Sequence, residues 1–204
     1  MSNAGASRLP VVEEFYSLQG EGANAGIAAW FIRLGGCDVC CPWCDTAYSW
    51  HADEGSFAEA EDIAARAAAS GAATAVITGG EPAMHPLELL TGRLHEHGLR
   101  ILLETSGAHV PRGEFDWVCL SPKSHRPPVA EALAIADELK VVAGCEEDLR
   151  WAEECASKVP EGCLLFLQPE WGRRSEAVPM ITEYVKAHPR WRVSLQLHKF
   201  LNIP

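Results

Sequence analysis

Four cysteines crowd into the eight residues from Cys37 to Cys44 of this 204-residue chain. Cys37, Cys41 and Cys44 have the spacing C-x3-C-x2-C, and three thiolates suit a 4Fe-4S cluster in which one iron has no protein ligand. A structural zinc site that uses all four cysteines is a second interpretation, and a cluster of reactive thiols is a third. Because Cys40 and Cys41 are adjacent, their side chains tend to point apart, whereas tetrahedral zinc sites usually take ligands in two separated pairs. The spacing therefore favours iron–sulfur chemistry, with Cys40 outside the ligand set.

Polar and glycine-rich segments follow several short apolar runs of the chain. In order, these segments are Arg33 with the cysteine cluster, Thr78-Gly79-Gly80-Glu81-Pro82, Glu104-Thr105-Ser106-Gly107, Ser121-Pro122-Lys123, Gln168-Pro169 and Gln196-Leu197-His198-Lys199. In parallel α/β sheets, ligands bind at the carboxyl ends of the strands. If the apolar runs are such strands, these segments meet in one shared active site.

The apolar runs are rich in β-branched and aliphatic residues, which is typical of buried strands. They cover residues 29–34, 75–78, 100–104, 117–120, 138–142, 164–168 and 192–197. Segments with helical periodicity lie between several of them, at 57–69, 86–97, 147–158 and 176–187. Alternating strands and helices predict a parallel sheet, but some intervals are too short for a full crossover helix. Since a complete eight-fold barrel usually needs about 250 residues, we expect an α/β fold that forms a partial, abbreviated (β/α)6-type parallel barrel.

The composition fits one globular domain. The hydrophobic fraction is 48% and the charged fraction 22%, which excludes disordered, collagen-like and coiled-coil classes. We expect a single domain over residues 10–204, with residues 1–9 a disordered tail or tag remnant. The formal charge of −11, without a basic cluster, argues against a nucleic-acid partner. Because no apolar stretch suits a membrane span or a signal peptide, we expect a cytoplasmic protein without a membrane partner.

Three of these features together resemble the radical S-adenosylmethionine superfamily. They are the C-x3-C-x2-C spacing after the first predicted strand, Trp43 before the third cysteine, and Gly79-Gly80-Glu81-Pro82 after the second predicted strand. The resemblance implies a 4Fe-4S cluster whose fourth iron is chelated by the amino and carboxylate groups of S-adenosylmethionine. It also implies that the backbone of the Gly-Gly-Glu-Pro segment receives the methionine amino group and that Trp43 lies near the adenine. Glycines permit close backbone approach, and Glu81 can face an ammonium group.

A narrower resemblance covers essentially the whole chain. It rests on Phe15-Tyr16-Ser17-Leu18-Gln19-Gly20-Glu21-Gly22, Cys44-Asp45-Thr46, the segments after Glu104 and Ser121, and the terminal residues 196–204. These segments are similar to those of the 7-carboxy-7-deazaguanine synthase family, which converts 6-carboxy-5,6,7,8-tetrahydropterin to 7-carboxy-7-deazaguanine. The resemblance implies a lyase of queuosine biosynthesis that acts as a homodimer with Mg2+ and a flavodoxin- or ferredoxin-type electron donor. Cys40 and Ser106 depart from the pattern, since Asn is expected at least as often as Ser at the latter position.

The family resemblance also implies roles around the cofactor. Thr46 binds Mg2+ through its hydroxyl, Thr78 lies near both ligands, and Ser121, Lys123 and Gln168 hold the ribose and carboxylate of S-adenosylmethionine. In the implied mechanism, reductive cleavage gives a 5′-deoxyadenosyl radical that abstracts hydrogen from substrate C6. Mg2+-assisted ring contraction, loss of ammonia and return of the hydrogen then follow.

A pterin carboxylate offers a donor edge and an anion for recognition. Glu21 or Glu104 can accept protons from the amidine-like edge, and the guanidinium of Arg33 offers a planar fork for the 6-carboxylate. A surface ion pair is the alternative role for Arg33. Further candidate substrate contacts are Gln19, His198 and, by the resemblance, the terminal carboxylate of Pro204.

The chain end is expected to pack beside the site. The strand predicted at 192–197 ends close to the terminus, and Phe200, Leu201 and Ile203 would gain by packing. The fixed φ of Pro204 limits how far the last carboxylate can move. A packed tail with its carboxylate in solvent is the alternative.

Two other functions remain compatible with the motifs. A radical activating enzyme that acts on a protein partner would share the cluster and the Gly-Gly-Glu-Pro segment, but it would need an open groove and usually a longer chain. A non-catalytic zinc-binding interaction module would use the cysteines alone.

Overall fold

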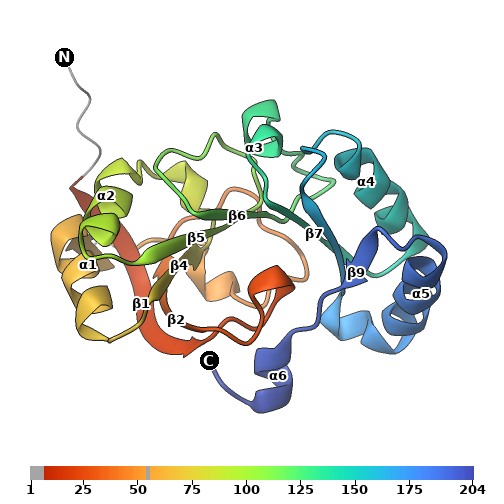
Figure 1. The fold of residues 1–204 in the computed structure, drawn as a ribbon, viewed down its shortest axis with the longest axis horizontal. Helices are drawn as coiled ribbons and strands as arrows, with labels where there is room; N and C mark the ends of the chain where they lie inside the picture. The colour runs from red at the N-terminus through yellow and green to blue at the C-terminus, as the bar shows by residue number, and fades with distance from the viewer. Residues whose placement is uncertain (1–6, 54–55) are drawn as a thin grey trace.

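The computed structural model describes residues 7–53 and 56–204. In that part of the chain nine strands form one sheet, in the order β3-β1-β2-β4-β5-β6-β7-β8-β9 (Figure 1). Every neighbouring pair from β2 to β9 is parallel, whereas β1 runs antiparallel to both β2 and β3. The sheet curves with helices outside it but stays open, with β3 and β9 at its two edges. The predicted α/β partial barrel is confirmed.

Most of the predicted elements are present with shifted ends. The strands are β1 (Arg8–Leu18), β2 (Ala28–Leu34), β3 (Phe57–Glu59), β4 (Thr74–Gly79), β5 (Arg100–Thr105), β6 (Trp117–Leu120), β7 (Glu138–Ala143), β8 (Leu164–Pro169) and β9 (Trp191–Val193). The α-helices are α1 (Ala60–Ala69), α2 (Glu88–Glu96), α3 (Ala130–Ala134), α4 (Glu146–Ala156), α5 (Arg174–Ala187) and α6 (Leu197–Leu201). Short 3-10 helices are η1 (Gly22–Asn24), η2 (Ala47–Ser49), η4 (Pro82–Met84) and η5 (Trp171–Arg173).

Strand β1 is absent from the sequence-based prediction. Glu13, Glu14 and Ser17 interrupt the apolar run that identifies a fully buried strand. Arg8 and Leu9 belong to β1, and Leu9 is only 1% exposed, so the folded domain begins before residue 10. The rest of the predicted tail falls mainly on residues 1–6, which lie outside the described residues.

The strand predicted over residues 192–197 is wrong in its extent. β9 ends at Val193, and the chain enters α6 at Leu197. Ser194 and Gln196 between them are buried polar residues. The Ser194 hydroxyl accepts from the Gly22 N–H at 3.0 Å, and the Gln196 amide donates to Glu21 at 2.9 Å. These hydrogen bonds to the β1–η1 loop take the place of a strand ladder.

The helices cover the outer face of the sheet in two groups. Helices α1 and α2 pack on the half formed by β2, β4 and β5, and α4 and α5 pack on the half formed by β7, β8 and β9 (Figure 1). The connection from β5 to β6 contains no described helix, and α3 between β6 and β7 has five residues. The predicted short crossovers are therefore present. None of the described helices is both long and apolar enough to cross a membrane.

Candidate active site

Two adjoining cavities lie at the carboxyl ends of the parallel strands. The first has a volume of about 220 Å³ and the second about 190 Å³. Glu21, Asp45, Thr78, Gly79 and Glu104 line both cavities and form a shared wall. Every residue expected to bind the cluster or S-adenosylmethionine lines the first cavity, and every residue expected to bind substrate or Mg2+ lines the second. The two groups of predicted residues therefore occupy two connected spaces.

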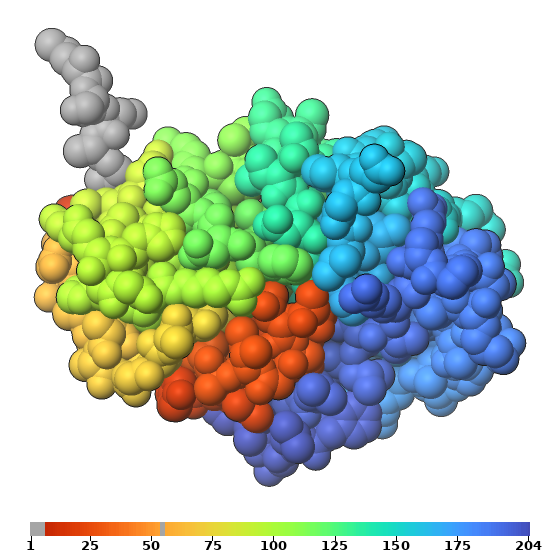
Figure 2. Space-filling view, viewed as in Figure 1, coloured from red at the N-terminus to blue at the C-terminus, as the bar shows by residue number. Residues whose placement is uncertain are grey.

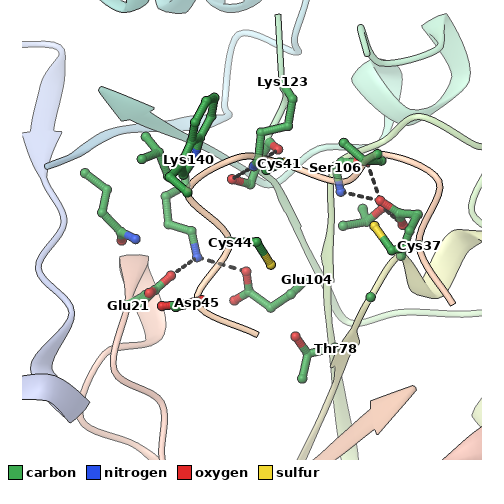
Figure 3. A pocket seen from close by; sticks show the side chains of 18 of the residues that line it. Glu21, Cys37, Cys41, Cys44, Asp45, Thr78, Glu104, Ser106, Lys123 and Lys140 are labelled. Atoms are coloured by element: carbon green, nitrogen blue, oxygen red, sulfur yellow. Dashed lines mark hydrogen bonds and ion pairs between the residues drawn. The ribbon is translucent and has the colours of Figure 1, made fainter. Parts of the chain in front are cut away.

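The cysteine loop follows β2 and folds back on itself. The Gly36 N–H donates to the Ser49 carbonyl at 2.9 Å, and the Cys37 N–H donates to the Trp50 carbonyl at 3.1 Å. Cys37, Cys41 and Cys44 line the first cavity (Figure 3), where burial raises the pKa of the Cys37 and Cys41 thiols. The loop therefore brings three thiols to one space.

Cys40 lies apart from these three thiols. It is exposed, has a positive φ of 48°, and its thiol donates to the Cys37 carbonyl at 3.3 Å. It does not line the first cavity. The left-handed backbone at Cys40 turns its side chain away while Cys41 faces inward.

The donor set on the first cavity fits an iron–sulfur cluster. Three thiols from one loop face a single cavity, which leaves room beside them for a second ligand. Among the described residues, no three His, Cys, Asp or Glu side chains lie close enough together to coordinate a metal ion. The fit therefore rests on the identity of the three donors and on their common cavity.

The two glycines after β4 allow the backbone to touch the cysteine loop. A Cβ at Gly79, where φ is 139°, would lie 2.1 Å from the Leu34 carbonyl oxygen, and one at Gly80 would lie 2.2 Å from the Gly36 oxygen. The Gly80 and Glu81 N–H groups donate to these carbonyls at 2.9 and 2.8 Å. Because an ammonium group only donates hydrogen bonds, the carbonyl oxygens of this segment are the backbone atoms that suit it as a ligand.

Glu81 has a different role from the expected contact with an ammonium. It is 1% exposed, and its carboxylate accepts hydrogen bonds from the Thr105 hydroxyl, from the Ala83 N–H at 3.0 Å, and from the N–H (2.8 Å) and hydroxyl of Ser106. These four donors use the hydrogen-bonding capacity of the two oxygens. Glu81 therefore ties the end of β5 to the segment after β4.

The far wall of the first cavity comes from the second half of the sheet. The Lys123 ammonium donates to the Ser121 carbonyl at 2.5 Å and to its hydroxyl at 2.7 Å, and burial lowers the pKa of Lys123. Gln168 is 4% exposed and accepts from the Ser194 hydroxyl at 2.8 Å. Trp43 remains 41% exposed. The Lys123 ammonium, hydroxyl and amide groups and an aromatic ring thus face the same space.

Arg33 lines the second cavity and also makes an ion pair. Its Nε lies 2.6 Å from Glu13, which accepts a further hydrogen bond from the Tyr48 hydroxyl at 2.7 Å. The guanidinium lies over the rings of Phe15 and Tyr48, 5.8 and 6.0 Å from their centroids. Among the described residues its side-chain hydrogen bond is made through Nε, so the terminal nitrogens keep donors for an anion in the cavity. Both predicted roles of Arg33 are compatible with this geometry.

Thr46 follows the last cysteine and lines the second cavity. Its hydroxyl lies 3.6 Å from the Cys44 sulfur and makes no capping hydrogen bond to η2. Asp45 beside it lies on the shared wall. A hydroxyl next to a carboxylate provides the oxygen donors that Mg2+ prefers, although such an ion would keep several waters.

The C-terminal segment closes the second cavity. The Leu197 N–H donates to the Gly20 carbonyl at 2.9 Å, and the Lys199 ammonium lies 2.9 Å from Asp45. Figure 2 shows the dark-blue C-terminal segment against the orange-red N-terminal segment on the same face of the molecule. His198 and Pro204 both line the cavity, and burial lowers the pKa of His198. The chain end is therefore built into the wall of the predicted substrate cavity.

The expected apolar packing of the tail is wrong in part. Phe200 and Leu201 are 65% and 55% exposed, although Phe200 meets the edge of Trp171 with ring centroids 5.6 Å apart. The tail is held mainly by polar contacts of Gln196 and Lys199 with Glu21 and Asp45. These contacts form only once distant segments meet, so the local apolar pattern could not reveal them.

A buried lysine that the sequence reading did not assign stands on the shared wall. Lys140 is 3% exposed, and its Nζ lies 2.7 Å from Glu21 and 2.9 Å from Glu104 (Figure 3). Burial alone would raise the pKa of Glu21, but the Lys140 ammonium lowers it to about 2. Burial alone would lower the pKa of Lys140, but the surrounding anionic groups raise it well above its ordinary value. The signal available in the sequence was a pair of charges, Glu138 and Lys140, at alternate positions of an otherwise apolar strand.

Comparison with known proteins places the fold and the cysteine loop in one class. Residues 31–133 match the Radical SAM superfamily. The chain is similar to the 7-carboxy-7-deazaguanine synthase of Flavobacterium psychrophilum, with 50% identity over 96% of this chain and 93% of the relative. It is 47% identical to that of Synechocystis sp., over 95% and 93% of the two chains, and 35% identical to that of Escherichia coli K12, over 96% and 99%.

A solved structure agrees with the sequence comparison. The crystal structure of QueE from Escherichia coli matches with a TM-score of 0.86 and 33% identity, over 94% of this chain and 95% of that one. The fold is that of a radical SAM enzyme, a class that uses a 4Fe-4S cluster and S-adenosylmethionine. Within this superfamily, the chain belongs to the 7-carboxy-7-deazaguanine synthase family.

Proposed function

We propose that this enzyme converts 6-carboxy-5,6,7,8-tetrahydropterin to 7-carboxy-7-deazaguanine with loss of ammonia, by hydrogen abstraction at substrate C6 and a ring contraction that Mg2+ assists. The observation that carries this proposal is the wall shared by the two cavities. A ligand held beside the three thiols and a ligand held beside Arg33 would be neighbours across Thr78 and Gly79. Such proximity is what a hydrogen transfer between two bound molecules requires.

In the first cavity, Cys37, Cys41 and Cys44 would hold the cluster. When bound, the cluster and S-adenosylmethionine supply the one-electron chemistry that removes a hydrogen atom from the substrate. The chain itself provides placement and excludes water. Lys123 offers a cation for the ligand carboxylate, and the hydroxyl, amide, carbonyl and ring groups around it come from Ser121, Gln168, Gly79, Gly80 and Trp43.

In the second cavity, the charges complement a pterin carboxylate. Arg33 would bind the 6-carboxylate through its terminal nitrogens, beside Mg2+ on the Thr46 hydroxyl. Glu21 and Glu104 would accept hydrogen bonds from the amidine-like edge of the ring. The remaining contacts would come from Gln19, Thr78, His198 and the terminal carboxylate of Pro204.

We further propose a cytoplasmic homodimer served by a flavodoxin- or ferredoxin-type electron donor. All eight cysteines are free, which suits a reducing compartment. An enzyme that draws a single electron into a cluster needs a one-electron donor of this kind. The oligomeric state is measured by light scattering, and the donor by turnover with reduced flavodoxin in place of dithionite.

Anaerobic turnover tests the proposed reaction. The carboxytetrahydropterin is incubated with reconstituted enzyme, S-adenosylmethionine, dithionite and Mg2+. The products are separated by chromatography and identified by mass spectrometry. We expect 7-carboxy-7-deazaguanine and ammonia, and no product with Cys41→Ser. An enzyme that cleaves S-adenosylmethionine yet leaves the pterin unchanged would contradict the proposal and favour an activating enzyme with a protein substrate. A colourless protein with stoichiometric zinc would favour the interaction module.

A further inference from the structure

Lys140 joins two carboxylates from distant parts of the chain. Glu21 lies in the loop after β1, Glu104 lies in β5, and Lys140 comes from β7 between them in the site. Its ammonium donates to Oε2 of Glu21 at 2.7 Å and to Oε2 of Glu104 at 2.9 Å, and its side chain is only 4% exposed. Two carboxylates this close would repel each other without a cation, and one of them would then tend to take up a proton.

The second oxygen of each carboxylate is held in a matching way. Glu104 Oε1 accepts from the Gln19 amide at 2.9 Å, and Glu21 Oε1 accepts from the Gln196 amide at 2.9 Å. Each oxygen therefore has one protein donor and, with two lone pairs, room for a further one. The arrangement fixes the direction of both carboxylates and leaves them able to accept from a ligand.

The ammonium approaches from one side of the shared wall. Lys140 lines the first cavity and does not line the second, whereas Glu21 and Glu104 line both. The carboxylate oxygens thus remain accessible from the second cavity, which also contains Arg33 and the chain end. A ligand in that cavity meets paired acceptors and does not meet the cation that fixes them.

We propose that Lys140 is a positioning residue that keeps Glu21 and Glu104 side by side as ionised acceptors, and so makes the second cavity selective for heterocycles with an amidine-type donor edge. This inference rests on the proposed function, because it assumes that the pterin occupies the second cavity. Lys140 acts through the two carboxylates and does not itself contact the substrate. The selectivity would separate a 2-amino ring from the otherwise similar 2-oxo ring.

The chemistry of the two rings explains the expected selectivity. The 2-amino-4-oxo ring of a pterin presents an N–H and an NH2 group on adjacent atoms, which match carboxylate oxygens. In a lumazine the NH2 group is replaced by a carbonyl oxygen, so this edge keeps its ring N–H but presents lone pairs to the carboxylate that the NH2 group would have met. A site built around hydrogen bonds to its ligand rejects an analogue that lacks the donor by orders of magnitude. A carboxylate that has become protonated loses this preference, because it can donate to the carbonyl.

Calorimetry on the anaerobic, reconstituted full-length protein tests the inference. The probes are 6-carboxypterin and 6-carboxylumazine, two oxidised and stable compounds that differ in the group at position 2. We expect the wild-type protein to prefer the pterin by at least about 100-fold. K140Q keeps an amide donor but no charge, and its preference should fall below about tenfold. K140R keeps the charge and should restore a preference of at least about 30-fold.

The comparison is valid only between variants that fold and bind their cofactors as the wild type does. Circular dichroism, iron content and the affinity for S-adenosylmethionine report whether each variant is intact. K140Q leaves two carboxylates facing each other without a cation, and this repulsion can prevent folding. The comparison is then made in the E21Q variant, where one of the two side chains is a neutral amide. E21Q/K140Q should then prefer the pterin less than E21Q does, because Glu104 has lost its cation.

Three results would overturn the inference. An intact K140Q protein, or E21Q/K140Q on its background, with unchanged selectivity would leave Lys140 a merely structural residue. A wild-type enzyme that turns over the carboxytetrahydropterin but binds the two probes equally would remove the selectivity and leave the proposed function standing. A wild-type protein that neither binds 6-carboxypterin nor forms product would overturn both.

Discussion

The hydroxyl of Ser17 donates a hydrogen bond to a terminal oxygen of Pro204 at 2.8 Å, which ties β1 to the last residue of the chain. Because Pro204 lines the second cavity, the free carboxylate lies beside the proposed pterin site. Most chain ends fray. This one is held by Ser17 and by the contacts of the segment from Gln196 to Lys199, so its charge has a defined place.

A C-terminal extension should therefore impair ligand binding. Two or more residues appended after Pro204 replace a charged acceptor with a neutral amide and crowd the cavity. We expect at least a tenfold weaker affinity for 6-carboxypterin by calorimetry, about the loss of one charge-assisted hydrogen bond. Folding and iron content should not change, and the same residues added before Met1 serve as the control. Unchanged affinity in the extended protein would place the terminal carboxylate outside the site.

Three of the four cysteine variants should lose iron, and the fourth should keep it. Cys37→Ser, Cys41→Ser and Cys44→Ser should each lose most of the iron after anaerobic reconstitution, because each removes a thiol from the first cavity. Cys40→Ser should keep a full iron content, since its exposed thiol donates to the Cys37 carbonyl and does not face the cavity. Iron and sulfide analysis of all four proteins decides the matter. Loss of iron in Cys40→Ser equal to that in Cys41→Ser would show that the ligand register is wrong.

Arg33→Ala should weaken substrate binding and leave cofactor binding unchanged. Loss of a desolvated, charge-assisted pair costs about 2–4 kcal/mol, which is roughly a 30- to 1000-fold loss in kcat/KM. Iron content and the affinity for S-adenosylmethionine should remain. Arg66→Ala is the matched control, because Arg66 also pairs with a glutamate of β1, Glu14 at 2.5 Å, but lies outside both cavities. Equal turnover of the two variants at low substrate concentration would assign Arg33 to the ion pair alone.

The acid stability of the protein should depend on Glu21. Its folded pKa of about 2 lies below the ordinary value of 4.5, so ionised Glu21 stabilises the fold fully above about pH 4.5. This contribution is lost as the pH falls from about 4.5 toward 2. The free energy of unfolding by urea should therefore fall less steeply over this range in Glu21→Gln than in the wild type. Glu161→Gln, a change at an exposed position, should follow the wild type. Parallel curves for Glu21→Gln and wild type would contradict this linkage.

Sequence reasoning found the parts of the site that depend on local spacing. The distances between Cys37, Cys41 and Cys44 along the chain, and the two glycines after β4, are fixed by short-range geometry. The ends of the apolar runs indicated which side chains share the open edge of the sheet. These signals were sufficient to predict the partial barrel and the three cluster thiols, whereas the roles of Thr46, Ser121 and Gln168 were implied only by the family resemblance.

The remaining features depend on contacts between distant segments. The ion pair of Lys140 with Glu21 joins residues 119 positions apart, and no pattern within β7 names its partners. The sequence did not show that the Glu81 carboxylate accepts hydrogen bonds from Thr105 and Ser106, because these donors lie at the end of β5, more than 20 residues away. Strand β1 was missed because its charged residues Glu13 and Glu14 are paired with Arg33 of the neighbouring strand β2 and Arg66 of helix α1, which lie far away in the sequence.

Label transfer from the substrate tests the central claim most directly. The enzyme is supplied with 6-carboxytetrahydropterin deuterated at C6, S-adenosylmethionine and a one-electron reductant under anaerobic conditions. If the two cavities place the ligands as we infer, deuterium should appear in recovered S-adenosylmethionine or 5′-deoxyadenosine while 7-carboxy-7-deazaguanine accumulates. Formation of the product with no deuterium in either adenosyl compound, or no product from the intact enzyme, would contradict hydrogen transfer across the shared wall.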